Sequence, residues 1–466
     1  EAAGAAERIL AFETSLAEPR LDKVERRDAR KTYNPKTVAE LQNMVPAFDW
    51  NTYFEEIGAK NLDTIIVSQP EYMKSLQDVI AKNSVEDWKD YLKWSIFNDA
   101  AGTLSTDIET ANWEFYSKTL RGAQEQRPRD ERALQMVNGT LGEALGKLYV
   151  DEHFPAEAKE KAQEMISNLI KAYENRIDNL SWMGEETKKK AKEKLGTTTI
   201  KVGYPDEWKD YSDLEIVNVE NGGSFFQNMM NSSKWRVADN MADLGQPVDK
   251  SEWFMPPQTV NAYYNPSYNE IVFPAAILQP PFYDYKADAA VNYGGIGAVI
   301  GHEISHGFDD SGSRFDAEGN LNNWWTDEDL KQFETLGKDL ADQYSNIEVL
   351  DSVYINGQFT LGENIGDLGG VNAAYDGLQI HLEEHGDPGK IDGYTPEQRF
   401  FLSWATVWRT KMRDEALKNK IKTDPHSPGM YRAYVPLQNI DAFYTAFDIE
   451  EGDKMYVAPE DRVKIW

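Results

Sequence analysis

The chain has 466 residues, 12% of them aromatic, a formal net charge of −30 and no cysteine. This length allows two or three domains with a large core, and the acidic balance argues against a nucleic-acid-binding protein, which needs a basic surface. Disulfides and cysteine-bound zinc are excluded, and no apolar run is long enough for a transmembrane segment. We interpret the excess acid mainly as a solubilising surface, with a preference for cationic peptides as the alternative.

Helices are expected to dominate residues 1 to about 200. Stretches rich in Ala, Glu, Lys and Leu at 155–175 and 184–195 have the spacing of amphipathic helices. Residues 37–40 and 84–87 each place a Thr or Ser three residues before an acidic residue, which is typical of a capping box at a helix start.

The character of the sequence changes after residue 200. Glycine and proline interrupt residues 200–260, which we expect to be a connection with small helices. Residues 259–278 predict two short strands around a turn at 265–269. Later helices are expected at 288–309, 326–344, 364–385 and 396–418. The predicted fold is therefore mainly α, with a small β-sheet beside the site described next.

The most informative motif is His302-Glu303-Ile304-Ser305-His306. Histidines at i and i+4 lie on one face of a helix, so both imidazoles can bind one metal ion. Glu303 is rotated by about 100° from His302, and it can take a proton from a zinc-bound water. A chance match and a pair of buried structural histidines are the alternatives.

A catalytic zinc ion needs a third protein ligand and one open position. Glu363 and Asp367 are again at i and i+4 on a predicted helix. One carboxylate can bind zinc, while the other accepts the free N–H of a histidine ligand. Asp309, three residues after His306, is a second candidate for holding an imidazole. Acidic residues that merely suit helix ends are the alternative for these positions.

Two further candidates follow near the C-terminus. His426 lies between Pro425 and Pro428, whose rings stiffen the loop, and it can donate to a developing oxyanion. Arg432 follows at a distance suited to binding a peptide carbonyl or carboxylate. An ordinary loop histidine and a surface arginine are the alternatives.

Another i, i+4 pair, His381 and His385, has Glu383 and Glu384 between its members and no helix core around it. We interpret this pair as part of a solvated helix face.

Taken together, these segments resemble the neprilysin and endothelin-converting-enzyme family of zinc endopeptidases. The resemblance covers essentially the whole chain and is densest from 260 to 466. The matching segments are 260–264, 271–282, 294–297, the motif at 302–306, 307–310, Trp324-Trp325, 362–367, 423–429 and Trp466.

The resemblance implies a role for each candidate around the metal. One zinc ion per chain would be bound by His302, His306 and Glu363. The catalytic residues would be Glu303, His426 and Asp367, and the residues that hold the ligands would be Asp309 and Asp367.

The resemblance also implies how substrate binds. Asn261 and Ala262 would pair with the substrate backbone by strand addition, and Arg432 would hold a substrate carbonyl. A pocket for a hydrophobic residue just after the cleaved bond would be lined by Ile277, Phe282, Val299, Val407 and Trp408.

The implied architecture is a thermolysin-like zinc catalytic domain at 206–466 and a helical lid region at 1–205 that encloses a cavity. Val463 occupies the place of a cysteine in animal members, which suggests a bacterial-type, cysteine-free relative. Family chains are longer at the N-terminus, so we expect a truncated chain whose missing segment is a possible partner. The resemblance favours a periplasmic or secreted location.

The sequence thus predicts a zinc-dependent endopeptidase that hydrolyses oligopeptides on the amino side of hydrophobic residues, through a zinc-bound water activated by Glu303. A peptide-binding or scaffold protein inactivated by truncation is the alternative, although a pure binder needs no general base. A glycosidase with paired carboxylates lacks any supporting motif.

Overall fold

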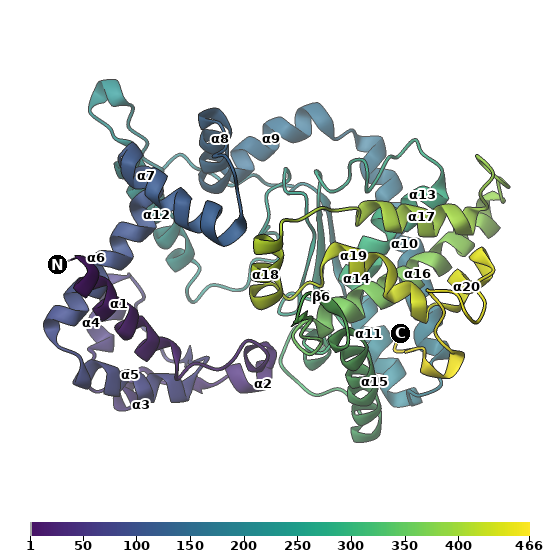
Figure 1. The fold of residues 1–466 in the computed structure, drawn as a ribbon, viewed down its shortest axis with the longest axis horizontal. Helices are drawn as coiled ribbons and strands as arrows, with labels where there is room; N and C mark the ends of the chain where they lie inside the picture. The colour runs from purple at the N-terminus through teal and green to yellow at the C-terminus, as the bar shows by residue number, and fades with distance from the viewer. Residues whose placement is uncertain (1) are drawn as a thin grey trace. The chain divides into compact units, whose positions relative to one another are not determined.

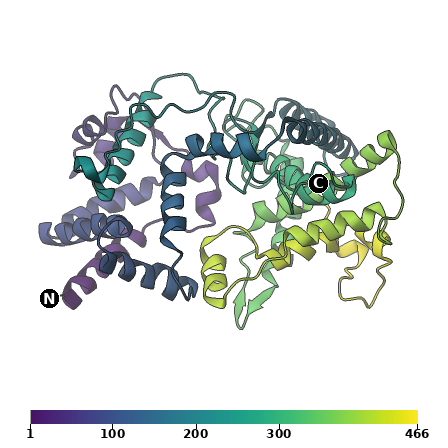
Figure 2. The same ribbon diagram turned by 90° about the horizontal axis from the view of Figure 1, so that it is seen from above.

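The computed structural model describes residues 2–466 and separates into two compact units. Unit 1 comprises Glu1–Arg129 and Asp210–Asp249, and unit 2 comprises Asp130–Lys209 and Lys250–Trp466. Figures 1 and 2 show the teal helix α12 (Phe225–Ala242) among the purple and blue helices of the N-terminal segment. This division by packing differs from the sequence-based division at residue 205, because 130–209 pack with the C-terminal residues.

The regular secondary structure of unit 1 is almost all helical. Its β1 (Pro35–Lys36) and β2 (Ile65–Ile66) form one short antiparallel pair. Both expected capping boxes are confirmed, at Thr37 with Glu40 and at Ser84 with Asp87. The helices are α1 (Ala2–Ala17), α2 (Ala29–Thr32), α3 (Val38–Met44), α4 (Trp50–Glu56), α5 (Pro70–Lys82), α6 (Val85–Ala100), α7 (Thr106–Trp113) and α12.

Unit 2 holds the remaining long helices. Before residue 210 they are α8 (Arg129–Thr140, whose first residue belongs to unit 1), α9 (Gly142–His153), α10 (Ala156–Asn179) and α11 (Glu185–Gly196). After residue 250 they are α13 (Ala289–Asn292), α14 (Ala298–His306), α15 (Asp327–Ser345), α16 (Leu361–His385), α17 (Pro396–Val407), α18 (Asp414–Thr423), α19 (Gly429–Tyr434) and α20 (Asp441–Phe447).

Two expectations about helices were wrong in detail. The region 200–260 contains α12, which is 18 residues long, instead of only small helices. The helix expected at 396–418 is split, because α17 ends at Val407 and α18 begins at Asp414. At this break the Arg409 and Thr410 amides donate to carbonyls three and two residues back, which turns the chain out of the helix.

A three-stranded sheet lies in unit 2. The expected strands around the turn are β4 (Tyr263–Asn265) and β5 (Glu270–Pro274), which pair antiparallel. The sequence did not predict β3 (Thr199–Gly203), which pairs parallel with the other side of β5. The order β3-β5-β4 leaves β4 at an edge of the sheet. Two further short strands, β6 (Glu348–Leu350) and β7 (Val353–Tyr354), form a separate hairpin.

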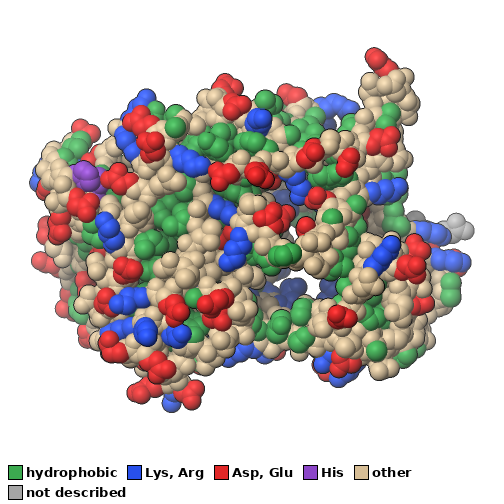
Figure 3. All heavy atoms as spheres, turned by 180° about the vertical axis from the view of Figure 1, so that it is seen from behind, with side chains coloured by type: hydrophobic (Ala, Val, Ile, Leu, Met, Phe, Trp, Pro, Cys, Tyr) green, Lys and Arg blue, Asp and Glu red, His purple; other side chains and the backbone are tan. Residues whose placement is uncertain are grey.

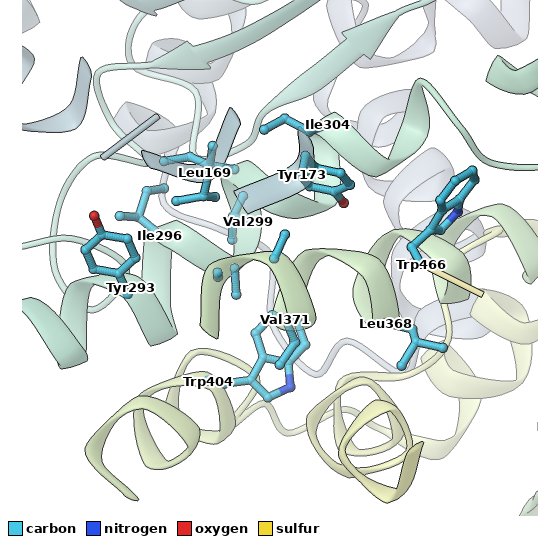
Figure 4. Packing of buried hydrophobic residues seen from close by; sticks show 14 of the residues in the cluster. Leu169, Tyr173, Tyr293, Ile296, Val299, Ile304, Leu368, Val371, Trp404 and Trp466 are labelled. Atoms are coloured by element: carbon cyan, nitrogen blue, oxygen red, sulfur yellow. The ribbon is translucent and has the colours of Figure 1, made fainter. Parts of the chain in front are cut away.

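The core of unit 2 forms around α14 and α16. Figure 4 shows Leu169 of α10, Val299 of α14, Val371 of α16 and Trp404 of α17 in one buried cluster. Gly301 explains how closely α14 approaches α16, since a Cβ at this position would lie 2.5 Å from the Gly370 carbonyl oxygen. The two helices that carry residues 302–306 and 363–367 are thus packed backbone to backbone.

The surface is charged and mixed in sign. Figure 3 shows acidic and basic side chains interspersed on the face in view. Among the described residues, no helix combines the length and the apolar character needed to cross a bilayer.

Candidate zinc centre and active site

The packing of α14 against α16 brings His302, His306 and Glu363 together. One ligand atom from each lies within 4.8 Å of the other two. Glu363 Oε2 is 3.3 Å from His302 Nε2 and 3.7 Å from His306 Nε2. The two imidazole rings lie 4.5 Å apart and nearly perpendicular. These are the three residues that the sequence proposed as metal ligands.

This group fits a zinc ion. Glu363 Oε2 is buried and accepts no well-aligned hydrogen bond among the described residues, although imidazole nitrogens surround it. An unsatisfied buried oxygen is costly unless a cation or a donor completes it. Two imidazoles and one carboxylate form a common catalytic zinc set, which leaves a fourth position open.

The charges of the three residues favour one another. Burial by itself would raise the pKa of Glu363, but His306, His302 and His426 hold it well below the usual value. Burial opposes protonation of His306 as well, yet Glu363 and Asp309 raise its pKa to about 10. The carboxylate of Glu363 and the imidazoles around it therefore stabilise each other's charged forms.

Two aspartates orient the histidine rings. Asp367 Oδ1 is 2.9 Å from His302 Nδ1, and Asp309 Oδ2 is 2.8 Å from His306 Nδ1. Each bond directs the Nε2 atom of its ring toward Glu363. Asp309 is itself fixed, because its Oδ1 accepts the backbone N–H groups of Ser311 and Gly312.

Arg432 lies behind this layer. Its Nε and one terminal nitrogen donate to the two oxygens of Asp367, at 2.8 and 2.7 Å. Its guanidinium carbon lies 3.9 Å from the centre of the Trp408 ring, in a cation–π contact. The arginine is buried and its charge is matched by Asp367, so the structure gives it a positioning contact in addition to the substrate contact expected from the sequence.

His426 reaches the metal group from its loop. Its Nε2 is 3.1 Å from Glu363 Oε2, and its side chain is 42% exposed. Asp424 Oδ1 accepts both the backbone N–H of His426, at 2.8 Å, and a bond from Nδ1, at 2.7 Å. Although burial acts the other way, Asp424 and Glu363 raise the pKa of His426 to about 9. A protonated, oriented imidazole therefore faces the site.

Glu303 lies between the two histidine ligands in α14 and is buried. Burial raises the pKa of its carboxyl above the usual value, although His302 and His306 act in the opposite direction. A carboxylate with a raised pKa is a better proton acceptor for a water molecule than an exposed one.

The predicted substrate residues lie on the same unit. Asn261 is exposed and Ala262 is buried, immediately before the edge strand β4. The five predicted pocket residues all belong to, or pack on, the main core cluster. Ile277, Val299 and Val407 are buried, and Phe282 and Trp408 are partly exposed.

Several supporting residues were missed by the sequence reasoning. Asp424 has a visible signal, since it stands two residues before His426. Lys194 of α11 has none, yet its buried ammonium donates to the carbonyls of Gly307, Gly312 and Phe315, each at 2.7 Å. These bonds hold the segment after α14, which contains Asp309.

Ser427 and Asn364 form a second missed connection. Ser427 Oγ donates to the Asn364 side-chain carbonyl at 2.8 Å, and both residues are buried. This bond connects the loop of His426 to the helix of Glu363, so it helps to fix the distance between His426 and Glu363.

A mainly helical fold, a His-x-x-x-His pair on one helix and a glutamate from a second helix packed against it define a zinc metallopeptidase. The family profiles agree: one for the N-terminal part of Peptidase family M13 matches residues 1–205, and one for Peptidase family M13 matches residues 261–463. The chain belongs to this family.

Known relatives are similar over nearly the full chain. The neutral endopeptidase of Lactobacillus helveticus is 36% identical over 98% of this chain and 68% of its own length. Human neprilysin is 33% identical over 98% of this chain and 64% of its own length. The chain thus spans about two thirds of the length of these relatives.

Solved structures show the same fold. The zinc metalloprotease Zmp1 of Mycobacterium tuberculosis, in complex with an inhibitor, has a TM-score of 0.95 and 44% identity over 100% of this chain and 71% of its own. PepO of Lactobacillus rhamnosis HN001 has a TM-score of 0.91 and 31% identity, with coverage of 100% and 71%.

Proposed function

We propose that this chain carries the hydrolytic site of a zinc endopeptidase that cleaves oligopeptides. The observation that carries the proposal is the convergence of His302, His306 and Glu363, each backed by its own hydrogen-bonding partner or charge, next to the buried carboxylate of Glu303. A binding protein has no use for such a carboxylate beside a metal group, whereas hydrolysis needs a base.

Glu303 acts as the general base. When bound, zinc supplies Lewis-acid polarisation and lowers the pKa of water. Glu303 accepts the proton of the water that attacks the peptide carbonyl carbon, and it then delivers this proton to the leaving amine nitrogen. Its burial keeps competing solvent away and raises its proton affinity to suit both steps.

His426 and Arg432 stabilise the negative charge that forms on the carbonyl oxygen. His426 presents a protonated imidazole fixed by Asp424, and a pre-oriented donor of this kind lowers the barrier without reorganisation. Arg432 holds Asp367 and thereby His302, and we propose that it also contacts a substrate carbonyl. Asp367 serves catalysis by keeping the His302 ring in place.

The substrate binds as an added strand. Because β4 is an edge strand, a peptide can pair with the residues before it, at Asn261 and Ala262. The apolar side chains of Phe282, Val407 and Trp408 favour a large hydrophobic residue just after the cleaved bond. Of the region 1–205 that the sequence predicts as a lid, residues 1–129 are proposed to form part of a lid that admits peptides and excludes folded proteins, because residues 130–205 pack within unit 2.

Two substitutions test this proposal. Glu303→Gln has the same shape but cannot take a proton, so it should keep zinc and lose about 10²–10⁴-fold in turnover. Glu363→Ala should lose most of its zinc. Metal analysis and cleavage of a short peptide mixture by the parent and both variants would show this. A Glu303→Gln protein within about tenfold of the parent, or a parent that binds peptides without cleaving them, would favour the binding-protein alternative.

A further inference from the structure

A second group of metal-binding side chains lies at the far end of α16. It consists of His381 and His385 from that helix and Glu164 from α10. One ligand atom from each lies within 4.8 Å of the other two. His381 is 18 residues after Glu363 on the same helix, which places it about 27 Å away along the axis. The group is therefore separate from the zinc centre.

The two helices that carry these side chains pack against each other. α10 and α16 pack along their length in the core of unit 2, through Leu169 and Val371 among others. The two imidazole rings stack at 4.3 Å with 20° between their planes, and the His381 ring also contacts Tyr293 at 5.7 Å. A metal ion lies in the plane of each imidazole that ligates it, so one of these two stacked rings must turn about its side-chain torsions to share an ion with the other.

A backbone contact selects the useful form of His385. Its Nδ1 lies 3.2 Å from the carbonyl oxygen of His381. A carbonyl only accepts, so Nδ1 carries the hydrogen, which leaves Nε2 as the ring atom that can bind a metal ion. That atom lies 3.7 Å from Glu164 Oε1. A metal-ligating histidine commonly donates its other ring N–H to a backbone carbonyl, as Nδ1 does here, and Nε2 lies beside a carboxylate that could bind the same ion.

The charges nearby are compatible with a bound cation. His381 is partly buried beside Tyr293, and Glu164 supplies an anionic ligand to the group. The facing cation, Lys171 of α10, lies 3.6 Å from the Glu384 carboxylate and is partly neutralised by it. The alternative is that His385 is only attracted to the carbonyl end of α16. This attraction would explain the position of His385, but it would not explain why Glu164 and His381 lie beside it.

We propose that Glu164, His381 and His385 bind a second divalent transition-metal ion, of the class of Zn²⁺, Ni²⁺ or Cu²⁺. Two imidazoles select these borderline ions over Ca²⁺ and Mg²⁺, which prefer all-oxygen sites. Water completes the coordination, because Glu164 and His385 are exposed. The ion links α10 to α16, so it stabilises the helix pair that supports the zinc centre. The interpretation of this histidine pair as a plain solvated face is thereby revised.

Zinc titration of the protein whose first site is already loaded tests the proposal. Calorimetry or equilibrium dialysis should detect one additional Zn²⁺ per chain. Removing both histidines, in His381→Ala/His385→Ala, should abolish this second event. Glu164→Gln should weaken it by about 10-fold or more, as expected for the loss of one anionic ligand. Added zinc should also raise the Tm of the loaded parent, and not that of the double variant.

His153→Ala is the matched control. His153 is an exposed histidine beside an acidic residue, Glu152, at 4.0 Å, and it belongs to neither metal group. This variant should bind the additional ion as the parent does. Because His381 packs on Tyr293, replacing it could disturb the fold. The single variant His385→Ala changes only an exposed residue and avoids this problem. Its affinity for the additional zinc ion should also fall by at least about 10-fold. The proposal is overturned if the parent binds no additional ion, or if the double variant and His153→Ala bind it equally.

Discussion

Four carboxylates within one site have three different tasks because their surroundings differ. Glu363 faces the imidazole Nε2 atoms and has a depressed pKa. Asp367 and Asp309 face the Nδ1 atoms and are held by Arg432 and by backbone amides respectively. No hydrogen bond to Glu303 is found among the described residues, and burial raises its pKa. The same functional group is thus a ligand, an orienting acceptor or a base according to which atoms lie beside it.

Zinc binding to the metal-free protein at pH 7 should release protons. The pKa of His306 is raised to about 10, so this imidazole is protonated throughout the range below that value and must lose its proton to bind a metal. The apparent zinc affinity should therefore rise with pH from 6 to 8, by up to about tenfold per unit for each proton released. Calorimetry in two buffers of different ionisation enthalpy counts the protons. Heats that are equal in both buffers would show that His306 is already neutral.

His426→Ala should reduce turnover by about 10²–10³-fold while zinc content and KM remain nearly unchanged. The reason is that His426 is a donor aimed at the site and not a ligand, since two imidazoles and Glu363 already fill three positions. Steady-state kinetics with metal analysis distinguishes the roles. Loss of zinc would make His426 a ligand, and a pure rise in KM would make it a ground-state contact.

Two helices in backbone contact set the geometry of the zinc centre. His302 and His306 come from α14 and Glu363 comes from α16. Gly301 and Gly370 stand opposite each other at the crossing, and a Cβ at Gly370 would lie 2.5 Å from the His302 backbone nitrogen. Because the two backbones are already in contact, the spacing between the helices cannot change without moving the ligands. The helix spacing therefore sets the distance between the histidines and Glu363.

Gly301→Ala should separate the two helices and weaken zinc binding by at least about 10-fold, with a loss of about 1–3 kcal/mol or more in stability from overpacking. The new methyl group would meet the Gly370 backbone, which cannot move aside as a flexible side chain can. Zinc titration and thermal unfolding measure both effects.

Gly139→Ala is the control for that prediction. Gly139 also lies in a helix, α8, and no atom is within 4 Å of where its Cβ would be. Alanine there should leave zinc binding unchanged and raise stability slightly, by up to about 1 kcal/mol, because alanine has the higher helix propensity. If Gly301→Ala and Gly139→Ala had the same zinc affinity and the same stability, the contact between α14 and α16 would not set the geometry of the zinc centre.

At the scale of the whole molecule, we expect cleavage before Leu, Ile, Phe or Val in a peptide library analysed by mass spectrometry. The apolar surfaces of Ile277, Phe282, Val407 and Trp408 are the reason to expect a hydrophobic residue after the cleaved bond. The proposed lid predicts slow attack on folded proteins. A preference for Lys or Asp after the cleaved bond, or rapid digestion of a folded protein, would contradict this prediction.

The sequence by itself determined the chemistry and most of the helices. His302, Glu303 and His306 are close in the chain, so helical periodicity alone places them on adjoining faces. Capping boxes at Thr37 and Ser84 are local for the same reason, since each joins residues three apart. Recognition of the remaining ligand, Glu363, rested on its own local pattern with Asp367 and on the family resemblance.

Only the tertiary structure decided what depends on contacts between distant segments. The parallel strand β3, the bonds of Lys194 to the segment after α14, and the link from Ser427 to Asn364 join residues 63 to 121 positions apart. The grouping of Glu164 with His381 and His385 is of the same kind. Periodicity and propensity describe neighbours along one element, whereas these contacts arise when elements pack, and packing depends on the shapes of all of them at once.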